Sequence, residues 1–288
     1  MKVLYLYNPK AGNTAKMWLH EAQNYAIDHD INLVSASVLD DPIPDNSYDR
    51  VIIAGGDGSV NRLVNRIINT DFDKPIAIIP AGTANDYATY LGMSKIIPNS
   101  VKTAFKGKPK PVDIGVANEQ AFINICGIGN LMQQPDNETR KAKKIWGKLA
   151  YLGFGLKSIF KMRNCKIKIE TMGKTYRGKF NFIAVLIGTG AGSIANLAPN
   201  AKNNDGLFDV VALRKLPIWE FPFILLKILF RTHIKDRRIL HFQTKELNII
   251  KKGKNPVFDT CNLDGEEGSS LPVNLKFAHR QLVFVHKK

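Results

Sequence analysis

The first chemically informative segment is Gly55-Gly56-Asp57-Gly58-Ser59, which follows the apolar run Val51 to Ala54 and precedes a helical pattern. Glycines at the end of a strand let the backbone approach a ligand closely, and the start of a helix attracts anions. Ser59 adds a hydroxyl donor. An acid such as Asp57 repels an anion unless a cation intervenes, and magnesium carried by a nucleotide is the natural cation. The segment therefore predicts a nucleotide phosphate site, with a helix cap as the alternative role for Asp57.

Two further turns have a similar character. Pro80-Ala81-Gly82-Thr83-Ala84-Asn85-Asp86 repeats the order of strand, glycine, hydroxyl and helix, although Asn85 and Asp86 are also suited to capping. Asn8-Pro9-Lys10-Ala11-Gly12 leaves a simple turn and a third phosphate contact equally open. Neither a Walker A pattern nor a full Gly-x-Gly-x-x-Gly pattern occurs.

A parallel sheet would bring these three turns together. Strand-like runs alternate with helical stripes through the first third of the chain, which is typical of a parallel sheet covered on both faces. The predicted strands are Val3 to Tyr7, Ile31 to Leu39, Val51 to Ala54 and Pro75 to Ile79. Ligands to such sheets bind at the carboxyl ends of the strands, where all three turns are expected.

The pattern changes after Lys106-Gly107-Lys108-Pro109-Lys110-Pro111, which we interpret as a linker. Beyond it, period-two alternation predicts an antiparallel, sandwich-type domain. The predicted strands are Lys166 to Glu170, Phe180 to Ile187, Leu207 to Leu213, Glu246 to Lys251 and Val273 to Phe277. Helical stretches interrupt them at 145–159 and 217–231. We therefore expect an α/β nucleotide-binding domain over residues 1–110 and a β-sandwich domain over residues 111–278.

Charge and cysteine usage bound the class of protein. Lys and Arg number 41 against 25 Asp and Glu, and a net charge of +16 attracts a polyanion: nucleic acid, an anionic membrane or a phosphorylated substrate. The three cysteines have no paired spacing, so neither a disulfide framework nor a zinc site is indicated. The first residues do not form a signal-peptide pattern, and the apolar stretch from Ile218 to Phe230 is too short and too interrupted to span a membrane. We expect a cytoplasmic protein.

With these motifs in place, the chain resembles the diacylglycerol kinase catalytic family over nearly its whole length, in particular bacterial lipid kinases related to sphingosine and ceramide kinases. The Pro-x-Gly-Thr-x-Asn-Asp pattern of residues 80–86 is the more specific match, since NAD kinases and phosphofructokinases share Gly-Gly-Asp-Gly. The resemblance implies an NAD-kinase-like α/β domain followed by an antiparallel β-sandwich. A final strand near Leu282 to Val285, within residues 279–288, is a candidate to return to the first domain.

The resemblance also implies roles for individual residues. Asn262-Leu263-Asp264-Gly265-Glu266 looks like the family's Asp-Gly-Glu element, although by itself it is an ordinary hairpin turn; the match implies Glu266 as proton acceptor and Asp264 as its partner. The segment 198–209 looks like a magnesium loop, which implies Lys202 and Leu207, through their carbonyls, and Asp205 as ligands. Asp57 is expected to act through the magnesium of the nucleotide. The expected nucleotide contacts are Asn8, Pro9, Lys10, Ala11, Gly12, Gly55, Gly56, Asp57, Gly58, Ser59, Val60, Asn61, Arg62, Gly82, Thr83, Asn85 and Asp86.

The implied function is phosphorylation of a lipid hydroxyl, on diacylglycerol or a related lipid, with ATP and Mg²⁺. Three departures from the family pattern motivate an alternative, a catalytically lapsed homologue that binds nucleotide or lipid: Arg62 in place of the usual Glu, Asn204 in place of an Asp, and a short 40–49 connection. An NAD kinase is disfavoured by the matches at 80–86 and 264–266. Nucleic-acid binding is not expected, because no recognised module accompanies the charge.

The excess of Lys and Arg is suited to contact with a membrane. Basic residues surround both helical stretches, and together with aromatic and aliphatic residues they suit docking on an anionic membrane. We therefore expect a peripheral protein at the inner face of the membrane, with a solvated basic helix face as the alternative. A homodimer is left open. The residues concerned are Lys141, Lys143, Lys144, Lys148, Lys157, Lys161, Arg163, Lys227, Arg231, Lys235, Arg237 and Arg238.

Overall fold

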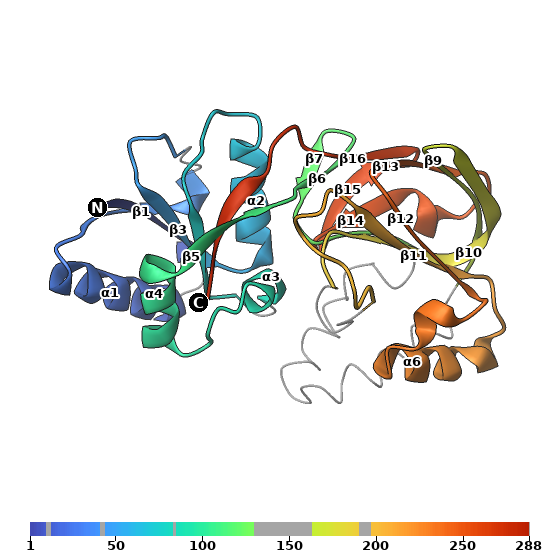
Figure 1. Cartoon of the computed structure of the whole chain (residues 1–288), viewed down its shortest axis with the longest axis horizontal. Helices are drawn as coiled ribbons and strands as arrows, with labels where there is room; N and C mark the ends of the chain where they lie inside the picture. Colours follow the sequence, from blue (N-terminus) through green and yellow to red (C-terminus); the bar gives the residue numbers. More distant parts are fainter. Residues whose placement is uncertain (10–12, 41–43, 83–84, 130–162, 190–196, 288) are drawn as a thin grey trace. The chain divides into compact units, whose positions relative to one another are not determined.

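The computed structural model describes residues 1–9, 13–40, 44–82, 85–129, 163–189 and 197–287 (Figure 1). It consists of two compact units, residues 1–114 with 278–288 and residues 115–277, and each is described by itself. The helix expected over 145–159, with the basic residues around it from Lys141 to Lys161, lies outside the described residues.

The first unit is built on a six-stranded sheet (Figure 1). Its first five strands are parallel, and the sixth is antiparallel to its neighbour. In order across the sheet the strands are β2 (Asn32–Ser37), β1 (Lys2–Tyr7), β3 (Arg50–Gly55), β4 (Ile76–Pro80), β17 (Leu282–His286) and β5 (Lys108–Val112). Nearly every residue of β1, β3 and β4 is buried, as expected for strands covered on both faces. The predicted α/β fold is confirmed.

Four helices connect these strands: α1 (Asn13–Asp28), α2 (Asp57–Ile67), α3 (Asp86–Tyr90) and α4 (Ile97–Lys106), with a 3-10 turn η2 at Val38–Asp40. Helix α1 packs against α4, and α2 packs against α3. The chain moves from β1 to β2 in one direction across the sheet and from β3 to β4 in the other. Right-handed crossovers therefore place α1 and α2 on opposite faces. Ligands bind where the order of an open sheet reverses in this way, here between the carboxyl ends of β1 and β3.

The interpretation of residues 106–111 as a linker is wrong. Most of this segment belongs to β5, which pairs antiparallel with β17. Proline has no N–H to donate and is therefore confined to the edges of sheets, and Pro109 and Pro111 lie on such an edge strand. Strand β17 brings the C-terminal segment into the first sheet beside β4.

The second unit is antiparallel throughout its described strands. One path of neighbours runs β15 (Glu266–Ser270), β14 (Thr260–Leu263), β8 (Ile125–Gly129), β10 (Lys174–Leu186), β9 (Cys165–Thr171), β13 (Glu246–Lys251), β16 (Val273–Phe277), β6 (Gly115–Ala117) and β7 (Gln120–Phe122). From β10 the sheet continues through β11 (Phe208–Arg214) to β12 (Ile239–Thr244).

This sheet closes over a shared core. The ring of Phe208 on β11 stacks on Phe277 of β16 with centroids 3.9 Å apart, and on Phe122 of β7 at 6.0 Å. Strand β11 is not a neighbour of β16 or β7 in the sheet, so the contacts require the part of the sheet that contains β11 to face the part that contains β16 and β7. The arrangement is the sandwich-type packing that the sequence predicted.

A second core lies on another side of this unit. Helix α6 (Phe221–Leu229), preceded by the 3-10 turn η4 (Ile218–Glu220), places Phe221 and Ile224 against apolar residues of β10, β11 and β12. The described part of the unit also contains the short turns η5 (His233–Lys235) and η6 (Pro256–Phe258). Among the described residues, no helix is long and apolar enough to cross a membrane.

Arg280 attaches the C-terminal segment to the end of α2. Its guanidinium donates hydrogen bonds to the backbone carbonyls of Ile67, Ile68 and Phe72. The last carbonyls of a helix have no partner within the helix and carry partial negative charge, so a cation at this position is doubly favourable.

We predict that Arg280→Met loosens the end of α2. Hydrogen bonds from a charged donor are worth about 1.5–3 kcal/mol, so amide hydrogen exchange in residues 64–72 should accelerate roughly 10- to 100-fold. The matched control is Arg177→Met, since Arg177 is exposed on β10 of the other unit. Unchanged exchange in Arg280→Met would show that the anchor contributes nothing.

Candidate functional site

The two glycine turns of the first unit are joined by the carboxylate of Asp57. Its Oδ2 accepts a hydrogen bond from the backbone N–H of Asp86 at 3.1 Å, and its Oδ1 accepts one from the N–H of Tyr87 at 3.0 Å. Asp57 is the first residue of α2, and the two donors open α3. The carboxylate therefore caps the following helix, α3, and ties the end of β3 to the end of β4.

The backbones of the same two turns are in direct contact. A methyl group built on Gly82 would lie 2.3 Å from the Cα of Gly56 and 2.9 Å from its nitrogen. A methyl group on Gly55 would lie 2.7 Å from the Oγ of Ser59. Glycine is required at these positions by this close approach, since every other residue carries a Cβ.

Asn85 shapes the second turn from within. Its Oδ1 accepts from the N–H of Gly82 at 2.8 Å, and its Nδ2 donates to the carbonyl of Gly82 at 2.7 Å. The residue is buried and holds a left-handed backbone conformation with φ of 56°, which Asn tolerates better than most residues. The N–H group of Gly82 therefore already has a partner. Gly82 and Asn85, both predicted nucleotide contacts, hydrogen-bond to each other and so stabilise the loop.

The first turn presents backbone N–H groups at the start of α2. Helical hydrogen bonding begins where the N–H groups of Ser59 and Val60 donate to the carbonyl of Gly56. The N–H groups of Gly56, Asp57 and Gly58 precede it and lack a partner within the helix. Gly58 is exposed, whereas Gly55 and Val60 are buried. The turn offers an anion a short row of N–H groups at a positive helix end.

The remaining predicted nucleotide contacts lie around these turns. Asn8 and Pro9 follow β1, at the same edge of the sheet. Asn61 and Arg62 lie in the second turn of α2, where Asn61 accepts from the side chain of Asn65 at 2.9 Å and Arg62 is exposed. Lys10, Ala11, Gly12 and Thr83 lie outside the described residues.

In the second unit, Asp264 and Gly265 form the tight turn of the β14–β15 hairpin. Both have positive φ, 54° and 99°, which is typical of Asp-Gly in a two-residue hairpin loop. The carboxylate of Asp264 accepts three backbone hydrogen bonds, from the N–H groups of Ile123, Asn124 and Ile125 at 2.7–2.9 Å. Asp264 therefore fastens the hairpin to the connection between β7 and β8.

Glu266, the predicted proton acceptor, is exposed at the start of β15. It pairs with Leu263 across the hairpin, and its neighbour Glu267 pairs with Asn262. Successive side chains of a strand point to opposite faces, so the two glutamates differ in direction although they share a strand. The clamp at Asp264 fixes the position from which Glu266 extends.

A pair of thiols lies in the core behind this hairpin. Cys126 on β8 and Cys261 on β14 are both buried. A hydrogen bond to Cys261, together with burial, raises the pKa of Cys126, and the same hydrogen bond lowers the pKa of Cys261. Their burial removes them from the reacting groups of the site.

The predicted magnesium loop precedes β11. Lys202 and Asp205 are exposed, and Oδ1 of Asp205 accepts from the N–H of Leu207 at 3.1 Å. Among the described residues, no three His, Cys, Asp or Glu side chains form a metal-binding group. One carboxylate and backbone carbonyls nevertheless fit Mg²⁺, which keeps several waters and takes few protein ligands. The nearby Asp209 is buried on β11, and its carboxylate accepts from His241 at 3.0 Å and from Gln243 at 3.1 Å.

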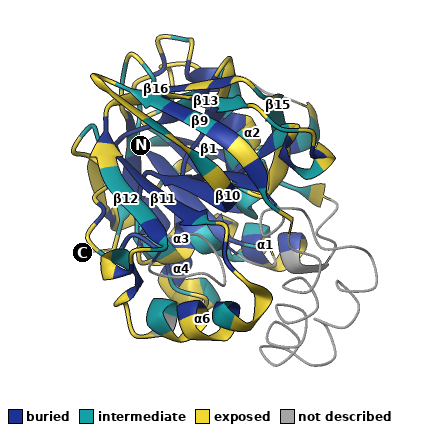
Figure 2. Cartoon of the chain, turned by 90° about the vertical axis from the view of Figure 1, so that its right-hand side faces the viewer, coloured by how far each residue is buried: buried dark blue, intermediate teal, exposed yellow. Residues whose placement is uncertain are grey.

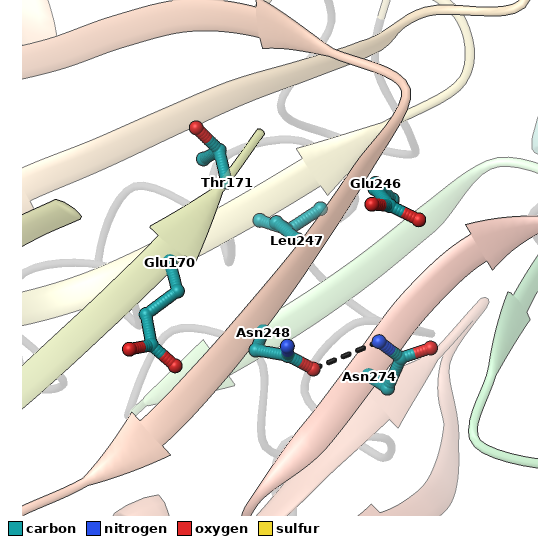
Figure 3. Close-up of a pocket in the computed structure, with 6 residues that line it drawn as sticks. All are labelled: Glu170, Thr171, Glu246, Leu247, Asn248 and Asn274. Atoms are coloured by element: carbon teal, nitrogen blue, oxygen red, sulfur yellow. Dashed lines mark hydrogen bonds between the residues drawn. The ribbon is translucent and has the colours of Figure 1, made fainter. Parts of the chain in front are cut away.

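A small pocket in the second unit is lined by none of these residues. It is lined by Glu170, Thr171, Glu246, Leu247, Asn248 and Asn274 and has a volume of about 120 Å³ (Figure 3). The side chains of Asn248 and Asn274 are hydrogen-bonded at 2.8 Å beside it. Ligand pockets usually measure about 300–1,000 Å³, so this one is too small for a nucleotide or a lipid.

Two family models match successive parts of the chain. Residues 2–117 match the diacylglycerol kinase catalytic domain, and residues 127–285 match the YegS C-terminal NAD kinase beta sandwich-like domain. The diacylglycerol kinase of Bacillus subtilis (strain 168) is 34% identical over 245 residues, covering 84% of this chain and 79% of the relative.

Solved structures show the same fold. The crystal structure of a diacylglycerol kinase from Bacillus anthracis (strain Sterne) has a TM-score of 0.79 at 26% identity, covering 99% of this chain and 96% of that chain. An NAD kinase from Archaeoglobus fulgidus, solved in complex with ATP, has a TM-score of 0.54 at 10% identity, covering 100% and 94%, and shares the fold alone.

A parallel α/β unit with paired glycine turns, together with an antiparallel β-sandwich unit, defines an NAD-kinase-like fold. The chain belongs to the diacylglycerol kinase family of lipid kinases. The resemblance inferred from residues 55–59, 80–86 and 262–266 is confirmed at the level of family and fold.

We predict that Gly82→Ala forces the two glycine turns apart. Overpacking of a close contact costs about 1–3 kcal/mol, and here the obstacle is backbone, which cannot rotate away. Calorimetry should show the unfolding of the first unit at a lower temperature. Gly173→Asn is the control, because nothing lies within 4 Å of a Cβ there and Asn tolerates its positive φ. A Gly82→Ala protein as stable as the wild type would contradict the close approach.

Proposed function

We propose that this protein transfers the γ-phosphate of ATP to the hydroxyl group of a lipid, diacylglycerol or a close relative. The observation that carries the proposal is the fused pair of glycine turns, which offers N–H groups at a helix start in a chain of the lipid kinase family. Phosphoryl transfer needs little covalent chemistry from the protein, since positioning and charge neutralisation supply most of the catalysis.

In this proposal the nucleotide lies at the carboxyl edge of the first sheet. The N–H groups of Gly56 and Gly58, with the hydroxyl of Ser59, hold phosphate oxygens. Asn61 and Thr83 are proposed to add polar contacts, and residues 8–12 are proposed as a third contact to phosphate. Gly82, Asn85 and Asp86 keep the second turn in the shape that the first turn requires.

Asp57 has two compatible tasks. Both oxygens accept N–H bonds from α3, and each retains a second lone pair. The residue thus fits a contact to nucleotide-bound Mg²⁺, directly or through water, while it caps α3. When bound, Mg²⁺ would neutralise charge on the phosphate oxygens. The loop of Lys202, Asp205 and Leu207 is proposed to hold a second, structural Mg²⁺.

Glu266 is the proposed proton acceptor. The lipid O–H bond breaks with its proton passing to the carboxylate of Glu266, the lipid oxygen bonds to the γ-phosphorus, and the bond to the bridging oxygen breaks to release ADP. Asp264 is assigned a positioning role, because its oxygens already accept three N–H bonds. The hairpin clamp keeps Glu266 in one place, which general-base catalysis requires.

The test is the pair Glu266→Gln and Glu267→Gln, assayed with labelled ATP and diacylglycerol in detergent micelles. The amide cannot accept the proton, so Glu266→Gln should lower kcat by about 10²- to 10⁴-fold with nucleotide affinity unchanged. Glu267→Gln should retain activity, because its side chain points to the other face of β15.

Equal rates in Glu266→Gln and wild type would remove Glu266 from the mechanism. A wild-type protein that binds ATP but phosphorylates no lipid in a broad panel would instead identify the catalytically lapsed homologue. Arg62 and Asn204 would then be the first positions to restore to Glu and Asp.

A further inference from the structure

Helix α6 has two apolar faces, and only one of them is covered by its own unit. Phe221, Ile224 and Ile228 recur at helical spacing and pack into the second core. Phe223, Leu226 and Phe230 recur with the same spacing on the opposite side. These three are 60%, 52% and 71% exposed, and Figure 2 shows exposed residues along the helix.

The exposed stripe continues into the turn before the helix. Trp219 of η4 is 70% exposed and Ile218 is 37% exposed. Three aromatic side chains and their aliphatic neighbours thus face solvent within one short segment. Contiguous apolar patches on a protein surface mark sites of interaction, whereas singly scattered ones need no explanation. We call the exposed apolar side of residues 218–230 the α6 surface; it consists of Ile218, Trp219, Phe223, Leu226 and Phe230.

The charge around the α6 surface is strongly positive. Residues 214–238 contain seven Lys and Arg but only two acids, Glu220 and Asp236. Both acids are already neutralised within the segment. Arg238 pairs with Glu220 at 2.5 Å and with Asp236 at 2.7 Å, and Lys227 pairs with Asp236 at 2.6 Å. These pairs lower the pKa of Asp236 and fix the helix on the unit. The excess charge is carried by exposed residues: Lys215, Arg231, Lys235 and Arg237.

Arg231 is placed by an unusual helix end. Thr232 N–H donates to the carbonyl of Lys227 and Arg231 N–H to that of Ile228, the hydrogen bonds of a Schellman cap. The left-handed position of this cap normally takes Gly, but here Arg231 occupies it with φ of 58°. An exposed basic side chain therefore stands directly beside Phe230, at the end of the apolar stripe.

We propose that the α6 surface docks on an anionic lipid bilayer, with Trp219, Phe223 and Phe230 entering the interface and the surrounding basic residues contacting lipid headgroups. Aromatic and aliphatic side chains flanked by Lys and Arg are the composition of helices that lie in a membrane interface. Each basic residue near an anionic surface strengthens binding roughly five-fold. A second copy of the chain fits less well, because a symmetric contact would oppose the basic residues to their own counterparts.

This inference does not depend on phosphoryl transfer, and its test contains no nucleotide. Co-sedimentation is measured with vesicles of equal parts phosphatidylglycerol and phosphatidylcholine, and with phosphatidylcholine alone. Wild-type protein should bind the anionic vesicles more tightly, and raising the salt from about 0.05 M to about 0.5 M should weaken that binding.

Trp219→Ser, Phe223→Ser and Phe230→Ser combined should weaken vesicle binding roughly ten-fold or more, since burying one such side chain is worth more than that factor. The control combines Ile27→Ser, Ile96→Ser and Met172→Ser, whose side chains are 78%, 63% and 66% exposed elsewhere. Lys215→Gln, Lys235→Gln and Arg237→Gln should remove most of the preference for anionic lipid. Lys174→Gln, Arg177→Gln and Lys245→Gln, also exposed, should not.

Three results would overturn the proposal. The first is wild-type protein that does not bind anionic vesicles at low salt. The second is an aromatic triple variant that binds as the wild type does while circular dichroism shows it folded. The third is a wild-type dimer that the aromatic triple variant converts to a monomer in analytical ultracentrifugation, which would assign the α6 surface to a second copy.

Discussion

The organisation of the candidate site depends on the carboxylate of Asp57. It accepts hydrogen bonds from the N–H groups of Asp86 and Tyr87, which lie 29 and 30 residues later in the chain, and so joins the two glycine turns. The bonds also satisfy two of the orphan donors at the start of α3, a helix of only five residues that could not persist alone. The contact between Gly56 and Gly82 then follows, because the turns are drawn together until backbone meets backbone. The negative charge of Asp57 is thus first a structural requirement of the edge at which we propose that the nucleotide binds.

The second unit uses the same device. Asp264 accepts three N–H bonds from residues 123–125 and so fixes a hairpin that would otherwise be attached through few strand contacts. In both motifs the aspartate determines backbone position, and the groups that we propose to meet the ligand are its neighbours: N–H groups in one case and Glu266 in the other. This separation explains why the aspartates of the two motifs, Asp57 and Asp264, are poorer candidates for proton transfer than Glu266.

The fold was largely predictable, and the reasons are visible in single elements. The buried strand at 50–55 is a continuous apolar run, whereas the helix after it and the strand at 246–251 each carry a clear hydrophobic period. The sequence predicts a linker where the structure has β5, because two prolines within five residues are untypical of a strand. The strand forms by pairing with β17, which lies some 170 residues later in the chain. The residue types of the site were readable from spacing. The partners of Asp57, Asp264 and Arg280 were not, since each depends on long-range contacts with backbone atoms that any sequence supplies.

The most direct test of the account is backbone amide NMR of the labelled protein titrated with Mg²⁺ and a non-hydrolysable ATP analogue. We predict that the amides of Gly56, Gly58 and Ser59 shift together with those of residues 81–87, because Asp57 makes the two turns one structure. Saturable binding that leaves both turns unshifted, or shifts one of them alone, would contradict it.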